Sequence, residues 1–209
     1  MKIPIMITKT EVFKDIEKHL LYDEKPSLYL NRISETEIFK EYPFKWLNDL
    51  KNTMQSPKHH PEGSAWNHTM LVVDEAARER HKSKNVRVFM WAALLHDIGK
   101  PGTTKVRNGR ITSYDHDKLG AKMTEKFLEE FSQDREFIEA VSNLVRWHMH
   151  ILFVLKGLPF GDIEGMKKHT DLEELALLGL CDRMGRTGAD RDEEMKNIDL
   201  FLDKVISKV

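Results

Sequence analysis

The chain has 209 residues, a formal net charge of -1 and a single cysteine, Cys181. This balance gives no overall attraction to nucleic acid or to a membrane surface, and one cysteine cannot form an intramolecular disulfide. No apolar run approaches the roughly 20 residues of a membrane-spanning helix, and the N-terminus is charged too early for a signal peptide. Composition therefore predicts a soluble, cytoplasmic protein with no membrane partner.

Helices dominate the predicted secondary structure. Residues 10–22 and 34–55 are predicted as helices joined by a turn around Pro26, and a loop rich in Pro, His and Gly follows at 56–66. Further helices are predicted at 66–81, 86–98, 116–131, 134–150, 171–185 and 189–207, with Asp115 and Asp134 as caps. The expected fold is all-α, divided into an N-terminal helical extension (1–55) packed on the core and a main domain (56–209).

Two segments interrupt the helical pattern. Residues 104–114 contain Asn108-Gly109 between β-prone residues, and this pair suits the positive φ angles of a type I′ turn. A short β-hairpin is therefore expected there. Residues 156–166 contain three glycines and a proline, which is typical of a loop. Either segment could form the rim of a site or a plain surface connection.

Five predicted helices each carry a His or Asp on the apolar stripe that faces the core. These residues are His68, Asp97, His116, His148 and Asp182. A lone histidine in such a place is more often a satisfied core residue than a ligand. Burying five such groups is costly unless something compensates them, and a shared cation is the simplest common explanation. His96 adjoins Asp97 and could reach the same ion.

The predicted ligands are imidazoles and carboxylates without thiolate. Such a set suits divalent Mn, Fe, Co, Ni or Zn, with Mg also allowed, and it does not distinguish among them. A metal held in this way can lower the pKa of a bound water and produce hydroxide near neutral pH. Two metals together would also stabilise the attacking and leaving oxygens of a phosphoryl transfer. The sequence thus predicts one or two divalent ions.

Several motifs together resemble a known family. LLHDIGKPGTT (94–104), with His68 upstream and Asp182 downstream, resembles the H…HD…D pattern of the HD-superfamily metal-dependent phosphohydrolases. The chain is also similar to the HD domain of bacterial tRNA nucleotidyltransferases, the CCA-adding enzymes. The matching pieces, in the family's order within about residues 44–186, are HPEGSAWNHT (60–69), LLHDIGKPGTT (94–104), DHDKLGA (115–121), VRWHMH (145–150) and CDRMGR (181–186).

The resemblance implies a helical HD bundle and assigns roles to residues of this chain. The implied ligands of a first metal are His68, His96, Asp97 and Asp182, and those of a second metal are His116 and His148, with Asp97 bridging. Lys100 stands where the family often places a phosphate-neutralising lysine. Only about 55 residues precede the motif region here, without the nucleotide-adding head of those relatives. CCA addition is therefore not expected, and a free-standing phosphatase or phosphodiesterase is.

Four further residues are candidates for substrate binding, together with Lys100. His60 and Glu62 could line the site or support its ligands, although the HPEG segment could equally be a turn shaped by its proline and glycine. Arg183 and Arg186 follow Asp182, and arginine binds phosphate oxygens in a bidentate manner. The alternative is that both arginines pair with the acidic run that follows them.

The expected function is metal-dependent hydrolysis of a phosphomonoester or phosphodiester by a metal-activated water, with Asp97 and Lys100 as the catalytic residues. The expected substrate is small and phosphorylated, a nucleotide or an RNA end. Two alternatives remain open: a di-iron HD-type oxygenase, which the same six ligands permit, and a non-catalytic nucleotide- or metal-binding module. The apolar seam of the predicted last helix leaves a homodimer open as well.

Overall fold

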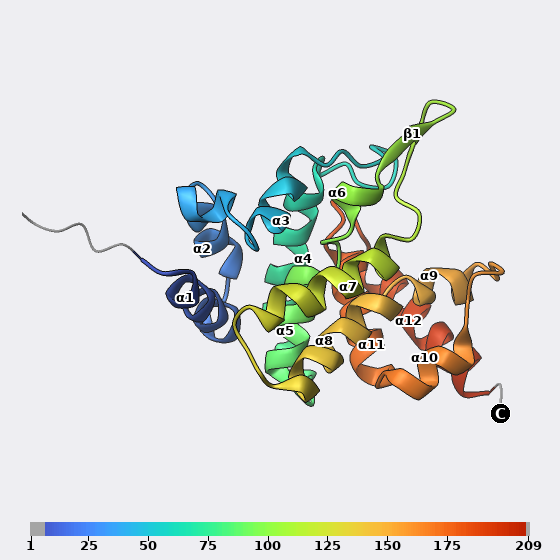
Figure 1. The fold of residues 1–209 in the computed structure, drawn as a ribbon. Coiled ribbons are helices and arrows are strands. Elements are labelled where there is room, and N and C mark those ends of the chain that lie inside the picture. The colour runs from blue at the N-terminus through green and yellow to red at the C-terminus, as the bar shows by residue number, and fades with distance from the viewer. Residues whose placement is uncertain (1–6, 208–209) are drawn as a thin grey trace, which may run out of the picture.

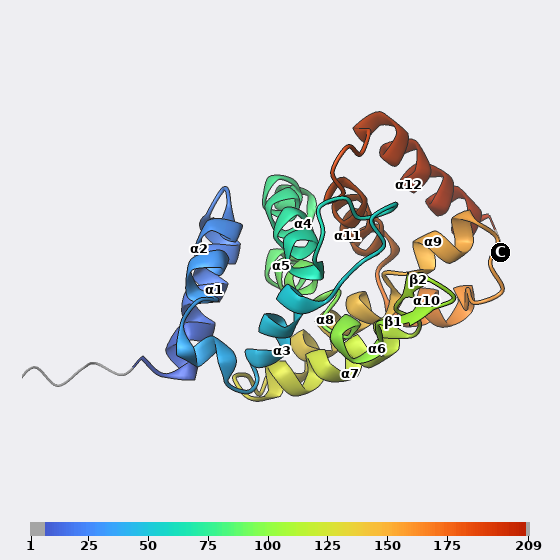
Figure 2. The ribbon, with the colours of Figure 1, turned by 90° about the horizontal axis from the view of Figure 1, so that it is seen from above.

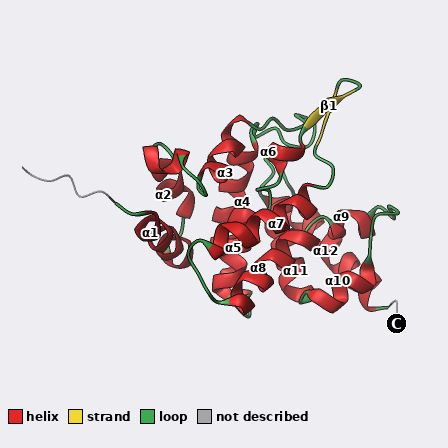
Figure 3. Ribbon diagram, viewed as in Figure 1, coloured by secondary structure: helices red, strands yellow, loops and turns green. Residues whose placement is uncertain are grey.

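The computed structural model describes residues 7–207 as a helical body with one short hairpin (Figures 1 and 3). The helices are α1 (Lys9–Tyr22), α2 (Pro26–Ile33), α3 (Lys45–Asn48), α4 (Ala65–Glu79), α5 (Val86–Leu95), α6 (Lys100–Thr103), α7 (His116–Glu129), α8 (Arg135–Trp147), α9 (His150–Leu155), α10 (Ile163–His169), α11 (Leu172–Met184) and α12 (Arg191–Ile206). Three 3-10 helices cover Glu37–Lys40, Asp49–Asn52 and Arg80–Lys82, and the strands are β1 (Lys105–Arg107) and β2 (Arg110–Thr112). The all-α fold class is confirmed, and no described helix is long and apolar enough to cross a membrane.

Helix α5 lies at the centre of the fold, as its apolar sequence predicts. All of its residues from Val88 to Leu95 are buried, and it contacts α1, α4, α8 and α11. Figures 1 and 2 show α1 and α2 at one edge of the body and α9, α10 and α12 at the other. The turn that follows α5 therefore emerges in the middle of the protein, where several helices can reach it.

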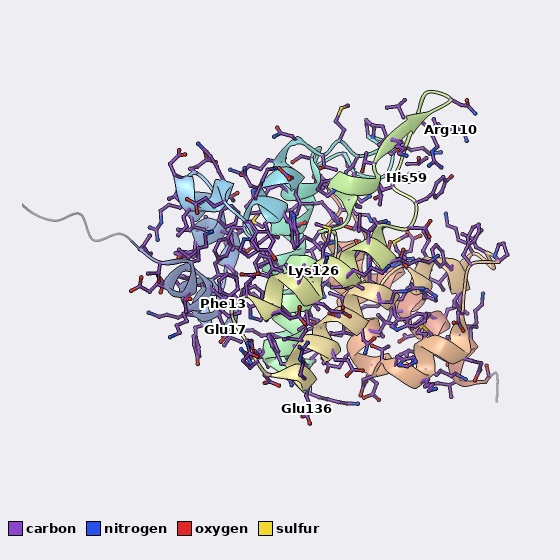
Figure 4. The ribbon with its side chains drawn as sticks, in the orientation of Figure 1. Phe13, Glu17, His59, Arg110, Lys126 and Glu136 are labelled. Carbon is purple, nitrogen blue, oxygen red and sulfur yellow. The ribbon has the colours of Figure 1, made fainter. Side chains whose placement is uncertain are left out.

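The first two helices pack on the central ones through aromatic and polar contacts. The ring of Phe13 in α1 stacks on Trp91 in α5, with 4.5 Å between the ring centres. The Glu17 carboxylate accepts a hydrogen bond from the Trp91 indole at 2.9 Å, and Figure 4 shows both Phe13 and Glu17 on α1. Asp74 in α4 accepts hydrogen bonds from the backbone and hydroxyl of Ser27 in α2. The division of the chain at residue 55 stays a prediction.

The predicted helix over 34–55 is wrong. That segment contains only the short helices Glu37–Lys40, α3 and Asp49–Asn52, and a proline at position 43 separates the first two. Proline lacks the backbone N–H that a helix interior requires. The predicted turn around Pro26 is also wrong, because Pro26 is the first residue of α2. Proline suits this position, where its missing N–H would have no partner in the helix.

The other local predictions are partly confirmed. The predicted helix over 134–150 divides into α8 and α9, and α10 begins inside the predicted 156–166 loop. Asp134 caps α8 by accepting a hydrogen bond from the Phe137 N–H, as predicted. Asp115 makes no capping hydrogen bond: it has a φ of 60° and pairs with Lys118 at 2.8 Å instead. The hairpin is confirmed, with positive φ at both Asn108 and Gly109.

Gly99 allows the turn after α5 to contact the start of α7 directly. A Cβ atom at this position would lie 2.2 Å from the carbonyl oxygen of His116 and 2.6 Å from the backbone nitrogen of Gly120. Both obstacles are backbone atoms, so neither can move away as a flexible side chain would. The absence of a side chain at Gly99 therefore sets the distance between two segments that carry candidate ligands.

We predict that Gly99→Ala destabilises the protein by about 1–3 kcal/mol, the usual cost of overpacking. Chemical denaturation followed by circular dichroism measures the change. Gly161→Ala is the matched control, because the nearest atom to its added Cβ lies at an ordinary 3.7 Å. Equal stability of the two variants would contradict the close approach described here.

Candidate metal centre

Six predicted ligands from five parts of the chain come together beside α5. Helix α4 supplies His68, the turn after α5 supplies His96 and Asp97, α7 begins with His116, α8 is followed by His148, and α11 supplies Asp182. They form two groups whose donor atoms all lie within 4.8 Å of one another: His68, His96 and Asp182 in one, and Asp97, His116 and His148 in the other. Five of the six residues are buried, and the Asp182 side chain is 15 % exposed.

Three of the imidazoles are held in the same way. Each has its Nδ1 against the backbone carbonyl three residues earlier in the chain. The distances are 2.9 Å from His96 to Ala93, 2.7 Å from His116 to Ser113 and 2.7 Å from His148 to Val145. A carbonyl can only accept, so Nδ1 carries the hydrogen and the neutral ring keeps a lone pair on Nε2. These Nε2 atoms are the ones that face the cluster.

The second group brings such lone pairs very close to one another. The Nε2 atoms of His116 and His148 lie 3.2 Å apart, and they lie 3.4 Å and 3.9 Å from Oδ1 of Asp97. Burial, followed by the charges of His116 and His96, lowers the pKa of His148 to about 4, which disfavours a proton there. When both rings are neutral, each directs an Nε2 lone pair at the same point, and a cation there could accept both. The group therefore fits a divalent metal.

The first group contains an imidazole between two carboxylates. His68 Nε2 donates to Asp182 at 2.9 Å, and its Nδ1 lies 2.9 Å from Glu62. Burial lowers the pKa of His68, but the two carboxylates raise it by more. A metal that took the Nε2 position would leave the Nδ1 hydrogen directed at Glu62, which is how second-layer carboxylates orient ligating histidines. His96 Nε2 is buried here without a hydrogen-bond partner, so it is free to ligate.

Glu62 is suited to this supporting role because it is ionised. Burial raises the pKa of Glu62, but hydrogen bonding with His68 and His60 lowers it by more. The resulting pKa is about 2. His60 Nδ1 donates to the same carboxylate at 2.8 Å. Both candidate residues of the HPEG segment therefore lie at the candidate metal centre. Glu62 lies beside His68, and His60 lies beside Glu62.

Asp97 lies between the two groups and directs one oxygen toward each. Its Oδ2 is 3.2 Å from His96 Nε2, and its Oδ1 is 3.4 Å from His116 Nε2. Burial raises the pKa of Asp97, but His96 and Lys100 outweigh this and hold the pKa well below its ordinary value. The carboxylate is therefore ionised, with Oδ2 beside His96 and Oδ1 beside His116.

Lys100 extends its ammonium group into the cluster. Its Nζ lies 2.6 Å from Oδ2 of Asp97 and donates to Oε1 of Gln55 at 2.5 Å. Gln55 in turn donates to the carbonyl of Ser64 at 3.3 Å. Gln55 was not among the residues predicted from the sequence. It lies in an irregular segment, and no motif or periodicity marks it.

The two arginines after Asp182 have different surroundings. Arg183 donates to Glu194 of α12 at 2.8 Å, which is the ion pairing that the sequence left open as an alternative. Arg186 Nη2 lies 3.7 Å from Asp182, and its Nε is buried without a hydrogen-bond partner. Both border a small cavity of about 20 Å³ that is also lined by the candidate ligands His148 and Asp182. The Nε hydrogen of Arg186 is therefore available to a ligand that binds beside these residues.

The fold and the cluster define a helical protein with a buried His/Asp centre that can hold divalent metal. Residues 60–186 match the family model described as HD domain, and the chain belongs to this family. The match spans all six candidate ligands, and HD domains bind divalent metals. The family match and the relatives below support an enzymatic role.

Curated relatives carry the name Multifunctional CCA protein. The chain is 27 % identical over 195 residues to the protein of Haemophilus influenzae (strain PittGG), covering 90 % of this chain and 46 % of that protein. It is 26 % identical over 192 residues to that of Pasteurella multocida (strain Pm70), covering 88 % and 45 %. It is 30 % identical over 145 residues to that of Halorhodospira halophila (strain DSM 244 / SL1), covering 66 % and 34 %. The chain thus spans less than half the length of these relatives.

We predict that Glu62→Gln weakens binding of Mn²⁺ by about 10–100-fold, the usual cost of losing a carboxylate that orients a ligating histidine. The reason is that a neutral amide holds the Nδ1 hydrogen of His68 less firmly than an ionised carboxylate. Isothermal titration calorimetry measures the affinity. Glu164→Gln is the control, because Glu164 is exposed on α10. If both variants bind the metal equally well, Glu62 does not support the metal centre.

Proposed function

We propose that this protein hydrolyses phosphate esters of nucleotides or RNA ends in a reaction that depends on divalent metal held by the two ligand groups. The observation that carries the proposal is the position of Asp97, whose two oxygens face one group each while the Lys100 ammonium lies 2.6 Å away. When bound, one or two metals would activate water and stabilise charge on the phosphate oxygens.

The position of the Lys100 ammonium favours a phosphate substrate over an uncharged one. Its side chain is buried, with 8 % of the residue exposed. A buried ammonium needs negative partners, and here it has one carboxylate oxygen and one amide oxygen, from Asp97 and Gln55. An ammonium has three hydrogens to donate, so a phosphate oxygen could take the remaining position. Lys100 would thereby offset charge that develops on phosphorus-bound oxygens.

A small cavity beside the centre brings an arginine next to the candidate ligands. It connects His148 and Asp182 with Arg186, and a guanidinium binds phosphate oxygens in a bidentate manner. We assign Arg186 to substrate binding, with an Nε hydrogen that has no protein acceptor. Arg183 has a structural role in this proposal, because its guanidinium already pairs with Glu194 of α12.

The choice of a nucleotide or an RNA end is supported by the relatives. Their printed name refers to CCA, and the sequence resembles the HD domain of tRNA nucleotidyltransferases. The test is a metal analysis of the purified protein beside a phosphatase screen with Mn²⁺, Ni²⁺, Co²⁺, Mg²⁺ and Zn²⁺. Its substrates include nucleoside monophosphates and nucleoside 2′,3′-cyclic phosphates. Metal-dependent phosphate release or ring opening supports the proposal, and bound iron with oxygen consumption but no hydrolysis would replace it with the oxygenase alternative.

We predict that Asp97→Ala abolishes hydrolysis and metal binding together, because one side chain serves both ligand groups. Elemental analysis of the reconstituted protein and the hydrolysis assay measure the two effects. Asp199→Ala, which removes an exposed carboxylate of α12, should change neither. Full metal-dependent activity in Asp97→Ala would exclude the proposed centre.

We predict that Lys100→Met lowers kcat by about 10²–10³-fold, the range for removing one group that stabilises transition-state charge, while the metal content stays the same. Methionine keeps a similar length but removes the ammonium. Lys122→Met is the control, because Lys122 is exposed on α7. A variant that loses the metal together with activity would assign Lys100 to stabilising Asp97 rather than to the substrate.

A further inference from the structure

The β1–β2 hairpin is joined at both ends to residues of the metal centre. Lys100 begins α6, which leads into β1, and β2 is followed after three residues by His116, the first residue of α7. At the base of the hairpin, the hydroxyls of Thr104 and Ser113 share a hydrogen bond of 2.7 Å. Figure 1 shows the hairpin extending away from the helical body. We call residues 104–114 the arm. A molecule bound along the arm would lie next to a substrate in the metal centre.

The arm carries positive charge that the described structure does not neutralise. It contains Lys105, Arg107 and Arg110 and no Asp or Glu. All three side chains are exposed, and within residues 7–207 none of them pairs with a carboxylate. This local excess contrasts with the whole chain, whose net charge is -1. The arm is therefore a concentrated positive feature on a nearly neutral protein.

The arrangement of these charges does not serve the stability of the hairpin. The strand register places Arg107 directly opposite Arg110, and like charges at opposite positions destabilise an antiparallel pair. Val106 is 72 % exposed, so the arm buries little apolar surface there. The Arg107 guanidinium lies over the ring of Tyr114, 4.9 Å from its centre. Tyr114 is itself 62 % exposed. Cations beside an exposed aromatic ring are the combination that binds single nucleic-acid strands.

Positive charge also borders the metal centre away from the arm. Arg186 lies 3.7 Å from Asp182. Burial, followed by the charges of Lys58, Arg186 and Lys156, lowers the pKa of His59. Figure 4 shows Arg110 and Glu136 at opposite ends of the molecule, with His59 toward the end that carries Arg110. His59, whose pKa these cations lower, therefore lies on the side of the protein that carries the arm.

From these observations we propose that the arm binds the phosphodiester backbone of a nucleic-acid strand whose terminal phosphate ester lies in the metal centre. The inference rests on the proposed function and narrows its substrate class from free nucleotides to strand ends. Three residues of a strand extend about 10 Å, which is the length of about three nucleotides in a stacked strand. The arm is long enough to contact the nucleotides that precede the reacting end.

The test compares the wild-type protein with a variant that carries Lys105→Gln, Arg107→Gln and Arg110→Gln together. Fluorescence anisotropy measures binding of a short labelled oligoribonucleotide at several salt concentrations. Each phosphate contact to a single strand contributes about 0.7 to the salt slope, so the variant should lose about 2 from it. An oligodeoxyribonucleotide of the same sequence shows whether the 2′-hydroxyl contributes.

The matched control removes three exposed charges elsewhere, by Lys14→Gln, Lys18→Gln and Lys126→Gln. This variant has the same net charge as the arm variant and should keep the wild-type salt slope. A third variant with Lys105→Arg, Arg107→Lys and Arg110→Lys keeps the charge and should keep most of the binding. Thermal melting of all three verifies that they fold. The inference is overturned if the arm variant binds the strand as tightly as the wild-type protein. It is also overturned if the arm variant keeps its strand binding but loses binding to phosphatidylserine vesicles.

Kinetics separate this inference from the proposed function. On an oligoribonucleotide ending in a 2′,3′-cyclic phosphate, the arm variant should lose about tenfold in kcat/KM, while its kcat/KM on a nucleoside 2′,3′-cyclic phosphate stays within twofold of wild type. Equal losses on both substrates would place the arm at the reacting phosphate and contradict a role in strand binding. Strand binding that depends on the arm, without turnover of either substrate, would retain the arm and reject the proposed hydrolysis.

Discussion

The buried carboxylate of Asp97 is the constraint around which the candidate site is arranged. An ionised group without partners in a protein interior is very costly, and this one is buried in the turn after the central helix α5. His96 and Lys100 hold it in the charged form. The positive and electron-rich groups around Asp97 come from segments distant in the sequence, so the folded core is needed to assemble them. The ion pairing with Lys100 compensates part of the charge, and the carboxylate oxygens and the Nε2 atoms around it could bind a divalent cation.

The helix ends explain how the imidazoles are oriented so accurately. The last carbonyls of a helix have no partner within the helix. His96 follows α5 and His148 follows α8, and each directs its Nδ1 to such a carbonyl, that of Ala93 or Val145. One hydrogen bond thus satisfies an orphan acceptor and selects the tautomer that leaves Nε2 free. Two of the four imidazoles are thus oriented by helix termini, His116 is oriented by the carbonyl of Ser113 before α7, and His68 lies against the carboxylate of Glu62.

The sequence predicted the long helices and the inward positions of the candidate ligands, because both follow from periodicity. Helix α4 buries His68 together with Val72 and Ala76 at helical spacing, although Leu71, three residues after His68, is 42 % exposed. The failures lie where periodicity says little. A single helix was predicted over 34–55, but the chain divides around a proline into pieces too short for a pattern. Gln55 belongs to that irregular region, and its contact with Lys100 depends on how residues 45 positions apart pack. No local sequence pattern predicts a contact between residues so far apart in the chain.

The burial of so many polar groups in the candidate centre is costly to the folded protein. The Nε2 atoms of His116 and His148 lie 3.2 Å apart in a buried position, and the cost of burying them must be offset by packing elsewhere. Packing is available: α5 is buried on all sides, and Arg191 of α12 pairs with Glu75 and Glu79 of α4. A cation that binds the folded chain more tightly than the unfolded chain adds stability in proportion to the logarithm of its concentration over its Kd. Metal binding and folding stability are thus linked through the residues that would perform the chemistry. The well-packed helices supply the stability that offsets the cost of burying these polar residues.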